Sequence, residues 1–147
     1  RPKTKGVGLK LEPKEKWAIL HSNYQTIGDF LDRMNRYTQV QTEELIKSGY
    51  KFRWQDLFEK PAGEFLSRFF ANRGFEDGVH GLTLSLLQAF SFLVVYLKVW
   101  EGEKFKQQDL RLAEFEDETR VIAKDVNYWI NQSKGGTLRK FLKIFKK

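Results

Sequence analysis

The longest apolar run of the chain covers residues 79–97, where Asp, Glu, Lys and Arg are absent. Its length is close to the ~20 residues that a helix needs to span a bilayer. Polar side chains dilute its first half, namely Thr83, Ser85, Gln88 and Ser91. The pattern predicts a helix over about residues 77–100. An interfacial or re-entrant segment, or a core helix covered by other helices, fits this pattern better than a full span.

Two helices are predicted before this run. Thr26 with Asp29 three residues later is typical of a capping box, and the apolar positions that follow recur at helical spacing until Gly49: Ile27, Phe30, Leu31, Met34, Tyr37 and Leu45. After a break over residues 50–60, Pro61 is suited to the first turn of a second helix. The buried face of that helix is expected to carry Ala62, Phe65, Leu66, Phe69 and Phe70, and its end is expected at Gly74.

A different periodicity follows the apolar run. Apolar and small polar positions alternate in steps of three and four, which is the seam of a coiled-coil-like helix: Phe105, Gln108, Leu112, Phe115, Thr119, Ile122, Val126 and Trp129. The seam fits an amphipathic helix that packs on its own protein, with a partner helix as the alternative. Gly135–Gly136 is expected to break this helix, and Thr137 to cap a short last helix.

Residues 1–24 read as extended. Val7, Leu9 and Leu11 alternate with other residues at the period of a strand, and a second apolar run covers residues 17–20. The predicted fold is therefore mainly α, with a short N-terminal hairpin or edge strands before four to five helices. We expect three parts: residues 1–25, 26–101 and 102–147.

The charge of the chain is concentrated at its two ends. The 147 residues carry a net charge of +7, of which the six basic and two acidic groups of residues 1–20 give +4 and the six basic groups of residues 134–147 give +6. Basic ends favour an anionic partner. In the last segment an apolar stripe lies beside dense positive charge, which is typical of a membrane-surface helix.

We therefore expect an anionic membrane surface as a partner. The residues expected to contact it are Phe90, Phe92, Leu93, Tyr96, Trp100, Leu138, Phe141, Leu142 and Phe145. Nucleic acid is not expected as a partner, because no recognised fold or stacking platform accompanies the basic tail. A solvated basic tail is the alternative interpretation of residues 134–147.

The sequence offers little catalytic chemistry. There is no cysteine, which excludes disulfides, thiolate metal sites and a cysteine nucleophile. The two histidines are not part of a metal-binding motif, and Gly6-Val7-Gly8 lacks the remainder of a phosphate-binding loop. His21 is the best single candidate for a ligand-binding or catalytic role, since it stands between a strand-like run and a helix. We expect no catalytic residue and no self-sufficient active site in this chain.

Several elements nevertheless occur in a recognisable order. They are a His-x-x-Tyr element, an Asn-Arg-Tyr-Thr motif, a Phe-rich segment, a Gly-Phe-x-Asp-Gly turn and an apolar helix that ends in a Trp-Glu pair, with the motifs at residues 21–24, 35–38, 65–70, 74–78 and 100–101. This order resembles the C-terminal region of bacterial glycosyltransferases of family 2, in the branch that assembles lipopolysaccharide core and related envelope glycans. The resemblance covers about residues 1–101. Ser22 departs from the pattern, which often has an aromatic residue there.

The resemblance implies the C-terminal part of a GT-A α/β enzyme that moves a sugar from a nucleotide-sugar donor to a lipid-linked or envelope glycan. It implies a divalent metal, Mg or Mn, held by an Asp-x-Asp motif expected upstream of Arg1. His21 is expected near the metal and the donor diphosphate, while Tyr24, Asn35 and Arg36 line or brace the acceptor side. The implied location is the cytoplasmic face of the inner membrane, as a peripheral protein.

The alternative from another class is a non-enzymatic helical module that binds a membrane surface or a protein. In that interpretation the seam of residues 105–129 contacts a partner helix, and helix-mediated self-association becomes possible. A dimer that dissociates on Leu112→Asp favours the module. Donor sugar, acceptor and linkage are not specified by this sequence.

Overall fold

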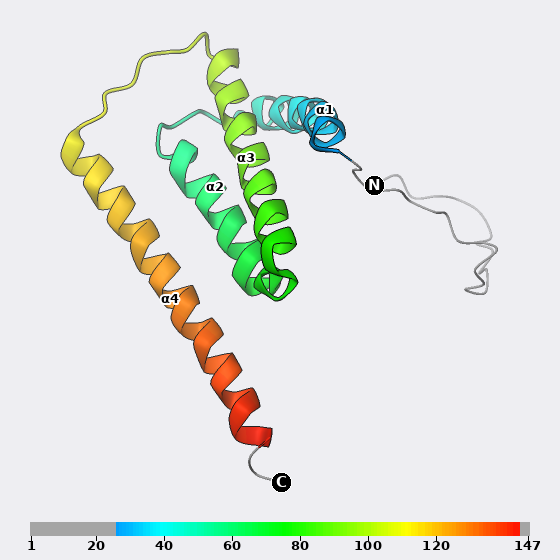
Figure 1. Cartoon of the computed structure of the whole chain (residues 1–147). Helices are drawn as coiled ribbons and strands as arrows, with labels where there is room; N and C mark the ends of the chain where they lie inside the picture. Colours follow the sequence, from blue (N-terminus) through cyan, green and yellow to red (C-terminus); the bar gives the residue numbers. More distant parts are fainter. Residues whose placement is uncertain (1–25, 145–147) are drawn as a thin grey trace, which may run out of the picture.

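The structure, a computed structural model, describes residues 26–144, with side chains for residues 26–134. This part of the chain is mainly α-helical, as predicted (Figure 1). The strands expected over residues 1–24 lie outside the described residues. The elements are α1 (Ile27–Lys47), α2 (Asp56–Leu66), the π-helical turn η2 (Ser67–Ala71), the 3-10 turn η3 (Gly74–Asp77), α3 (Gly78–Gly102) and α4 (Leu112–Ile144).

The first helix begins where the sequence predicts. The Asp29 backbone N–H donates to Thr26 Oγ1 at 3.0 Å, and the Thr26 backbone N–H donates to Asp29 Oδ2 at 3.1 Å. This reciprocal pair is the expected capping box, and it satisfies two backbone donors that the first turn leaves free. After the helix, Gly49 adopts a φ of 81°, a conformation that glycine enters without steric cost.

The second helix begins earlier than predicted. It starts at Asp56, so Pro61 lies inside it rather than in its first turn. The cause is the Asp56 carboxylate, whose Oδ2 accepts the Arg53 backbone N–H at 2.9 Å and fixes the chain direction at that point. Proline removes one helical hydrogen bond. After Leu66 the helix widens into η2.

The fourth helix differs from its prediction at both of the expected boundaries. It starts at Leu112 rather than near Phe105, because Lys104 and Phe105 have positive φ values of 58° and 53° that end helical geometry there. It then continues through Gly135–Gly136 to Ile144 as one helix of 33 residues. A glycine costs about 1 kcal/mol in a helix, and the long helix tolerates two of them without a break.

The third helix is the centre of the fold and spans nearly its predicted range. Helices α1 and α2 both pack on α3, their backbones do not approach each other, and α4 lies along α2 and η2 (Figure 1). The buried side of α3 includes the small residues Gly81, Ser85 and Ala89, one turn apart. Small residues allow the neighbouring backbone to come close: a Cβ on Gly81 would lie 1.8 Å from the Gly74 carbonyl oxygen.

Candidate functional site

The Asn-Arg-Tyr-Thr motif lies on α1 and contacts α3. The Lys98 ammonium donates to three oxygens of α1: the Asn35 backbone oxygen at 3.0 Å, Asn35 Oδ1 at 2.8 Å and Thr38 Oγ1 at 3.0 Å. Thr38 is 2% exposed. Two of the four motif residues therefore join α1 to α3.

The other two motif residues face solvent. Arg36 and Tyr37 are both exposed. An exposed guanidinium is a suitable fork for a phosphate or carboxylate. Of the residues expected to bind substrate, Asn35 thus holds Lys98 and Arg36 stays open to a ligand, while His21 and Tyr24 lie outside the described residues.

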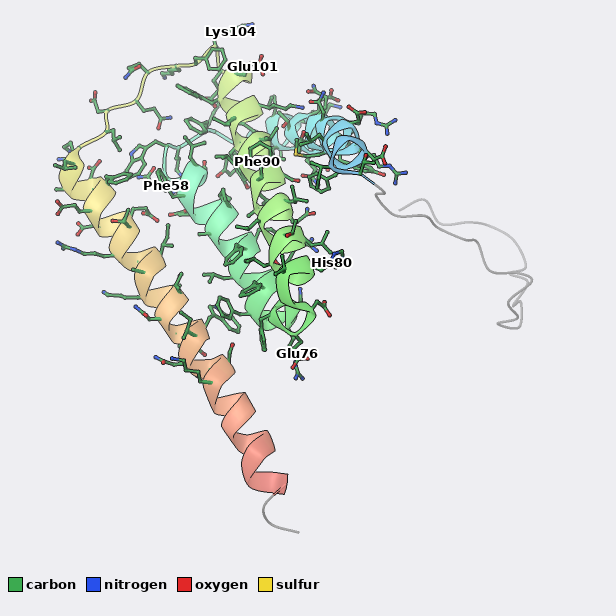
Figure 2. The ribbon with its side chains drawn as sticks, in the orientation of Figure 1. Phe58, Glu76, His80, Phe90, Glu101 and Lys104 are labelled. Carbon is green, nitrogen blue, oxygen red and sulfur yellow. The ribbon has the colours of Figure 1, made fainter. Side chains whose placement is uncertain are left out.

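No group of His, Asp or Glu side chains suited to a metal ion occurs in the described part of the chain. His80 lies on the exposed surface of α3, as Figure 2 shows. The expected role of His21 as a metal ligand falls outside the described residues and stays a prediction.

A pocket of about 320 Å³ lies between α1 and α3. We call it the α1–α3 pocket, and its lining residues are Gln41, Glu44, Leu45, Phe92, Val95 and Tyr96. Beside it, the Thr42 hydroxyl donates to the Val95 backbone oxygen at 3.2 Å in a buried contact. Burial raises the pKa of the Tyr96 hydroxyl, and the Asp56 carboxylate raises it further. The pocket combines an apolar aromatic surface with one amide and one carboxylate.

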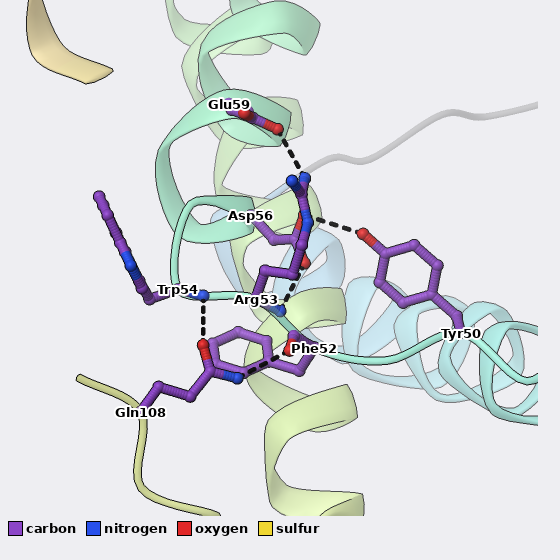
Figure 3. A network of polar contacts seen from close by, with 7 residues as sticks. All are labelled: Tyr50, Phe52, Arg53, Trp54, Asp56, Glu59 and Gln108. Carbon is purple, nitrogen blue, oxygen red and sulfur yellow. Dashed lines mark hydrogen bonds and ion pairs between the residues drawn. The ribbon is translucent and has the colours of Figure 1, made fainter. Parts of the chain in front are cut away.

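A network around Asp56 organises the connection from α1 to α2 (Figure 3). The buried Asp56 carboxylate accepts the Tyr50 hydroxyl at 2.8 Å and Arg53 Nη2 at 3.1 Å, besides the Arg53 backbone N–H. Burial and then the hydrogen bond to Asp56 raise the pKa of Tyr50 to about 12. The hydrogen bond to Asp56 also raises the pKa of Arg53. Sequence reasoning missed this network, although Tyr50, Arg53, Asp56 and Glu59 recur every three residues.

The Gln108 side chain attaches the α3–α4 connection to the same segment. Its Nε2 donates to the Phe52 backbone oxygen at 2.7 Å, and its Oε1 accepts the Trp54 backbone N–H at 3.0 Å (Figure 3). The Phe52 ring stacks on Trp100, with centroids 5.5 Å apart. The two hydrogen bonds that Gln108 makes with Phe52 and Trp54 are called the Gln108 clamp. Its role is structural, since it satisfies backbone groups between two helices.

One side of α3 carries an unpartnered apolar stripe. Its residues are spaced by three or four and lie on one helix face, and we call them the α3 ridge: Val79, Leu82, Leu86, Phe90, Leu93 and Leu97. Val79 is 79% exposed, and Phe90, which Figure 2 labels on α3, is 45% exposed. Scattered apolar residues are ordinary on protein surfaces, whereas a contiguous patch marks an interaction surface.

The residues expected to contact a membrane divide into three groups. Phe90 and Leu93 belong to the α3 ridge. Phe92 lines the α1–α3 pocket, and Trp100 stacks on Phe52. Tyr96 also lines that pocket, is only 9% exposed and packs edge-on against Tyr50, with ring centroids 5.8 Å apart. The side chains of Leu138, Phe141, Leu142 and Phe145 lie outside the described ones.

In the described residues, one helical stretch, Gly74–Gly102, is long and apolar enough to cross a membrane by length and composition. The most apolar window of this stretch is one-third buried within the protein. The core helix of a soluble protein satisfies the same criterion, so this finding does not distinguish a span from a core or surface helix.

No family model, curated protein or solved structure matches the chain. The resemblance to family 2 glycosyltransferases therefore stays a prediction that rests on the ordered motifs.

Proposed function

We propose that this chain is the helical C-terminal region of a membrane-associated glycosyltransferase of family 2. The whole enzyme moves a sugar from a nucleotide-sugar donor to a lipid-linked or envelope glycan acceptor. The supporting observation is the contact of Lys98 with Asn35 and Thr38. It joins the Asn-Arg-Tyr-Thr motif to the apolar helix, so two elements of the resemblance that lie about 60 residues apart are physical partners.

In this proposal the chain does not carry the chemical step. The donor site, the Asp-x-Asp motif and the general base belong to a GT-A domain upstream, and the divalent metal supplies neutralisation of the donor diphosphate there. The helices described here supply the acceptor side and the membrane contact. Arg36, exposed on α1, is available to a phosphate of a lipid-linked acceptor or of the donor.

The membrane contact is assigned to the α3 ridge and the basic C-terminal segment. Full burial of a Leu, Val or Phe side chain is worth about 1.5–3 kcal/mol, so the six partly exposed side chains of the ridge supply on the order of 5 kcal/mol. Each Lys or Arg near an anionic leaflet adds about 1 kcal/mol, and residues 134–147 carry six of them. Together they favour reversible binding to the cytoplasmic face of the inner membrane.

The enzymatic part is tested with a protein that carries the upstream sequence together with residues 1–147. With Mg²⁺ or Mn²⁺ and a panel of nucleotide sugars, we expect it to release nucleoside diphosphate, and we expect the 147-residue chain alone to release none. Absence of an Asp-x-Asp motif after a strand in the upstream sequence, or release by neither protein, contradicts the proposal.

The membrane part is tested by co-sedimentation of the 147-residue chain with vesicles that contain anionic phospholipid. Leu86→Glu with Phe90→Glu is expected to reduce binding strongly, whereas Val121→Glu, an exposed apolar residue on α4, serves as the matched control. The variant Phe141→Glu with Phe145→Glu tests separately whether the basic C-terminal segment contributes to vesicle binding. Unchanged binding in the ridge variant removes the α3 ridge from the proposal, and unchanged binding in the tail variant removes the tail.

The alternative is a helical interaction module that uses the seam of residues 105–129. Phe115 in the predicted seam contacts Phe58 with ring centroids 5.3 Å apart, and Trp129 stacks on Phe70 at 6.5 Å. Phe115 and Trp129 of the seam thus contact α2 and η2 of their own protein, whereas Leu112 of the seam is 73% exposed. A partner protein on the α3 ridge remains as the second candidate, and light scattering after size exclusion measures whether the chain associates.

A further inference from the structure

One side of α4 is left uncovered by the rest of the described protein. Among the described elements, α4 has backbone contacts with α2 and η2 alone (Figure 1). Phe115 and Trp129 point to that side, where they contact Phe58 and Phe70. The opposite side is formed by exposed residues that recur every three or four positions, and we call them the α4 outer face: Ala113, Asp117, Val121, Lys124, Tyr128 and Asn131.

The charges of α4 are separated along its length. Residues 112–125 carry five acidic and two basic groups, a net charge of −3, whereas residues 126–147 carry six basic groups and no acidic one. The helix macrodipole favours this order only within the first and last turns. Asp117 and Arg139 lie beyond those turns, because α4 extends from Leu112 to Ile144. The dipole of α4 therefore does not account for the separation.

The spacing of three residues on α4 suits a two-fold axis. Tyr128 is the midpoint of Leu112–Ile144, and Asp117 and Arg139 lie 11 positions before and after it. Eleven residues make about three helical turns, so the three positions are on one side of the helix. If a second α4 runs antiparallel with its Tyr128 at the same axis, each Asp117 lies opposite the Arg139 of the other copy.

We propose that two copies of this chain associate through the α4 outer face, with antiparallel α4 helices and Tyr128 at the two-fold axis. The acidic half of each helix then faces the basic half of the other along the full ~50 Å of α4. A parallel pair would instead place like charges opposite each other, which is unfavourable at an interface. Tyr128 is 57% exposed, and a central tyrosine is a frequent source of binding energy in interfaces.

The acidic half of α4 is accessible to a second copy. The Asp117 side chain is 77% exposed, and its carboxylate lies 3.5 Å from Arg120 Nη1. An exposed pair of this kind contributes little to stability, so Asp117 can exchange it for the second copy's arginine. Within one chain Asp117 and Arg139 are about 33 Å apart and cannot pair. Val121 lies opposite Gly135 in this register, so it carries little of the contact.

The first test is cross-linking through a single cysteine, because the chain has no native cysteine. Tyr128→Cys is expected to form a disulfide-linked dimer under mild oxidation, since the two Cα atoms of a disulfide lie within about 7 Å. Ala113→Cys, on the same outer face, is the matched control. In the antiparallel pair its two copies are separated by about 45 Å along the helix axis, so it should not cross-link. Cross-linking at neither position, at both equally or only at position 113 overturns the proposal.

The second test is sedimentation equilibrium of the 147-residue chain without lipid. We expect a monomer–dimer equilibrium that shifts towards monomer as the salt concentration rises. Asp117→Arg and Arg139→Asp each place like charges at both symmetric contacts, and each is expected to weaken the dimer by about tenfold or more. An equimolar mixture of these two variants restores opposite charges at both contacts. It is expected to form a heterodimer with nearly the affinity of the parent.

Asp32→Arg is the control for net charge, because it makes the same charge change at an exposed position on α1. It should associate like the parent. A monomer at every concentration, equal effects of Asp32→Arg and Asp117→Arg, or a mixture that stays monomeric contradicts the proposal. A dimer that Leu112→Asp dissociates while Asp117→Arg leaves it intact uses the seam instead of the outer face. The proposal does not depend on the glycosyltransferase function, so either one can fail while the other stands.

Discussion

At the scale of single residues, Asp56 is the one charged side chain that is buried among the described residues. Its side chain is fully buried and accepts the Tyr50 hydroxyl and two N–H groups of Arg53. Removal of the Asp56 carboxylate would leave these donors without an acceptor. The free-energy cost of such unpaired donors exceeds the net contribution of one ordinary hydrogen bond. The residue therefore determines both where α2 starts and how firmly the preceding loop is held.

We expect Asp56→Ala to lower the free energy of unfolding by about 3 kcal/mol, in the range for breaking a buried hydrogen-bonded charge. Urea denaturation measures the change. Glu59→Gln is the control, because it removes another carboxylate from the same Arg53, but in a pair whose side chains are 36% and 52% exposed. Exposed pairs contribute about 0–1 kcal/mol. Equal losses in the two variants contradict the buried role of Asp56.

Tyr50 makes the stability dependent on pH in the alkaline range. Folding raises its pKa from 10.0 to about 12, so the folded state holds the phenolic proton more tightly than the unfolded state. The resulting stabilisation is fully present below pH 10 and is lost as the pH rises towards 12.

In Tyr50→Phe this contribution is absent at every pH. We expect the variant to be less stable than the parent by about 1 kcal/mol at pH 7, and the difference to shrink between pH 10 and 12. Urea denaturation of both proteins at pH 7, 9 and 11 measures this difference in stability. A difference that grows above pH 10 has the wrong sign for a raised pKa.

At the scale of elements, the fold depends on how closely η3 approaches α3. Gly81 leaves room for the Gly74 carbonyl oxygen, 1.8 Å from the position a Cβ would take. The contacting atom is backbone, which cannot move aside as a flexible side chain does. The N-terminal turn of α3 and the preceding 3-10 turn are therefore a single packed unit.

Gly81→Ala is expected to destabilise the protein by more than 2 kcal/mol, a value in the range of overpacking. Gly63→Ala is the matched control within α2, since a Cβ there meets no atom within 4 Å. It is expected to stabilise by about 0.5–1 kcal/mol through helix propensity. Thermal unfolding compares the two, and a neutral Gly81→Ala shows that η3 can withdraw from α3.

The elements that the sequence predicted well are those defined by local signals. The capping box of Thr26 and the continuous apolar run of α3 need no distant partner, and both boundaries agree with the structure to within two residues. The starts of α2 and α4 depend instead on the Asp56 network and on positive φ values near Lys104. Spacing along the chain does not report such contacts.

Only part of the candidate site could be predicted from the sequence, because most of its contacts also join residues that are distant along the chain. The Asn-Arg-Tyr-Thr motif singled out Asn35, but its partner Lys98 is 63 positions away. The α1–α3 pocket needs six side chains from two helices that only the fold brings together. Tyr96 looked like a surface residue of an apolar helix, and its burial follows from the loop that carries Tyr50.

At the scale of the whole molecule, α4 is the least integrated helix. It lies along α2 and η2, and its C-terminal part extends beyond the other helices (Figure 1). Its attachment relies on a few aromatic contacts, of Phe115 with Trp54 and Phe58 and of Trp129 with Phe70. A helix with one packed side opens at a lower free energy than the helix at the centre of the core.

Hydrogen exchange is expected to report this difference. Phe115→Ala should speed the exchange of α4 amides markedly while α3 amides keep their protection, because the Phe115 ring contacts Trp54 in the α1–α2 loop and Phe58 on α2. Val121→Ala, at an exposed position on α4, is the control and should leave both helices unchanged. Loss of α3 protection together with α4 shows that the four helices unfold as one unit.

The position of α3 also sets the order in which this chain can fold while it is being made. Among the described helices, a ribosome releases α1 and α2 before α3, and these two helices have no backbone contact with each other. A nascent chain that stops at Leu66 therefore has amphipathic helices without a shared core. The packing of these helices on one another waits until α3, up to Gly102, has left the exit tunnel, and until then the apolar faces of α1 and α2 are exposed to chaperones.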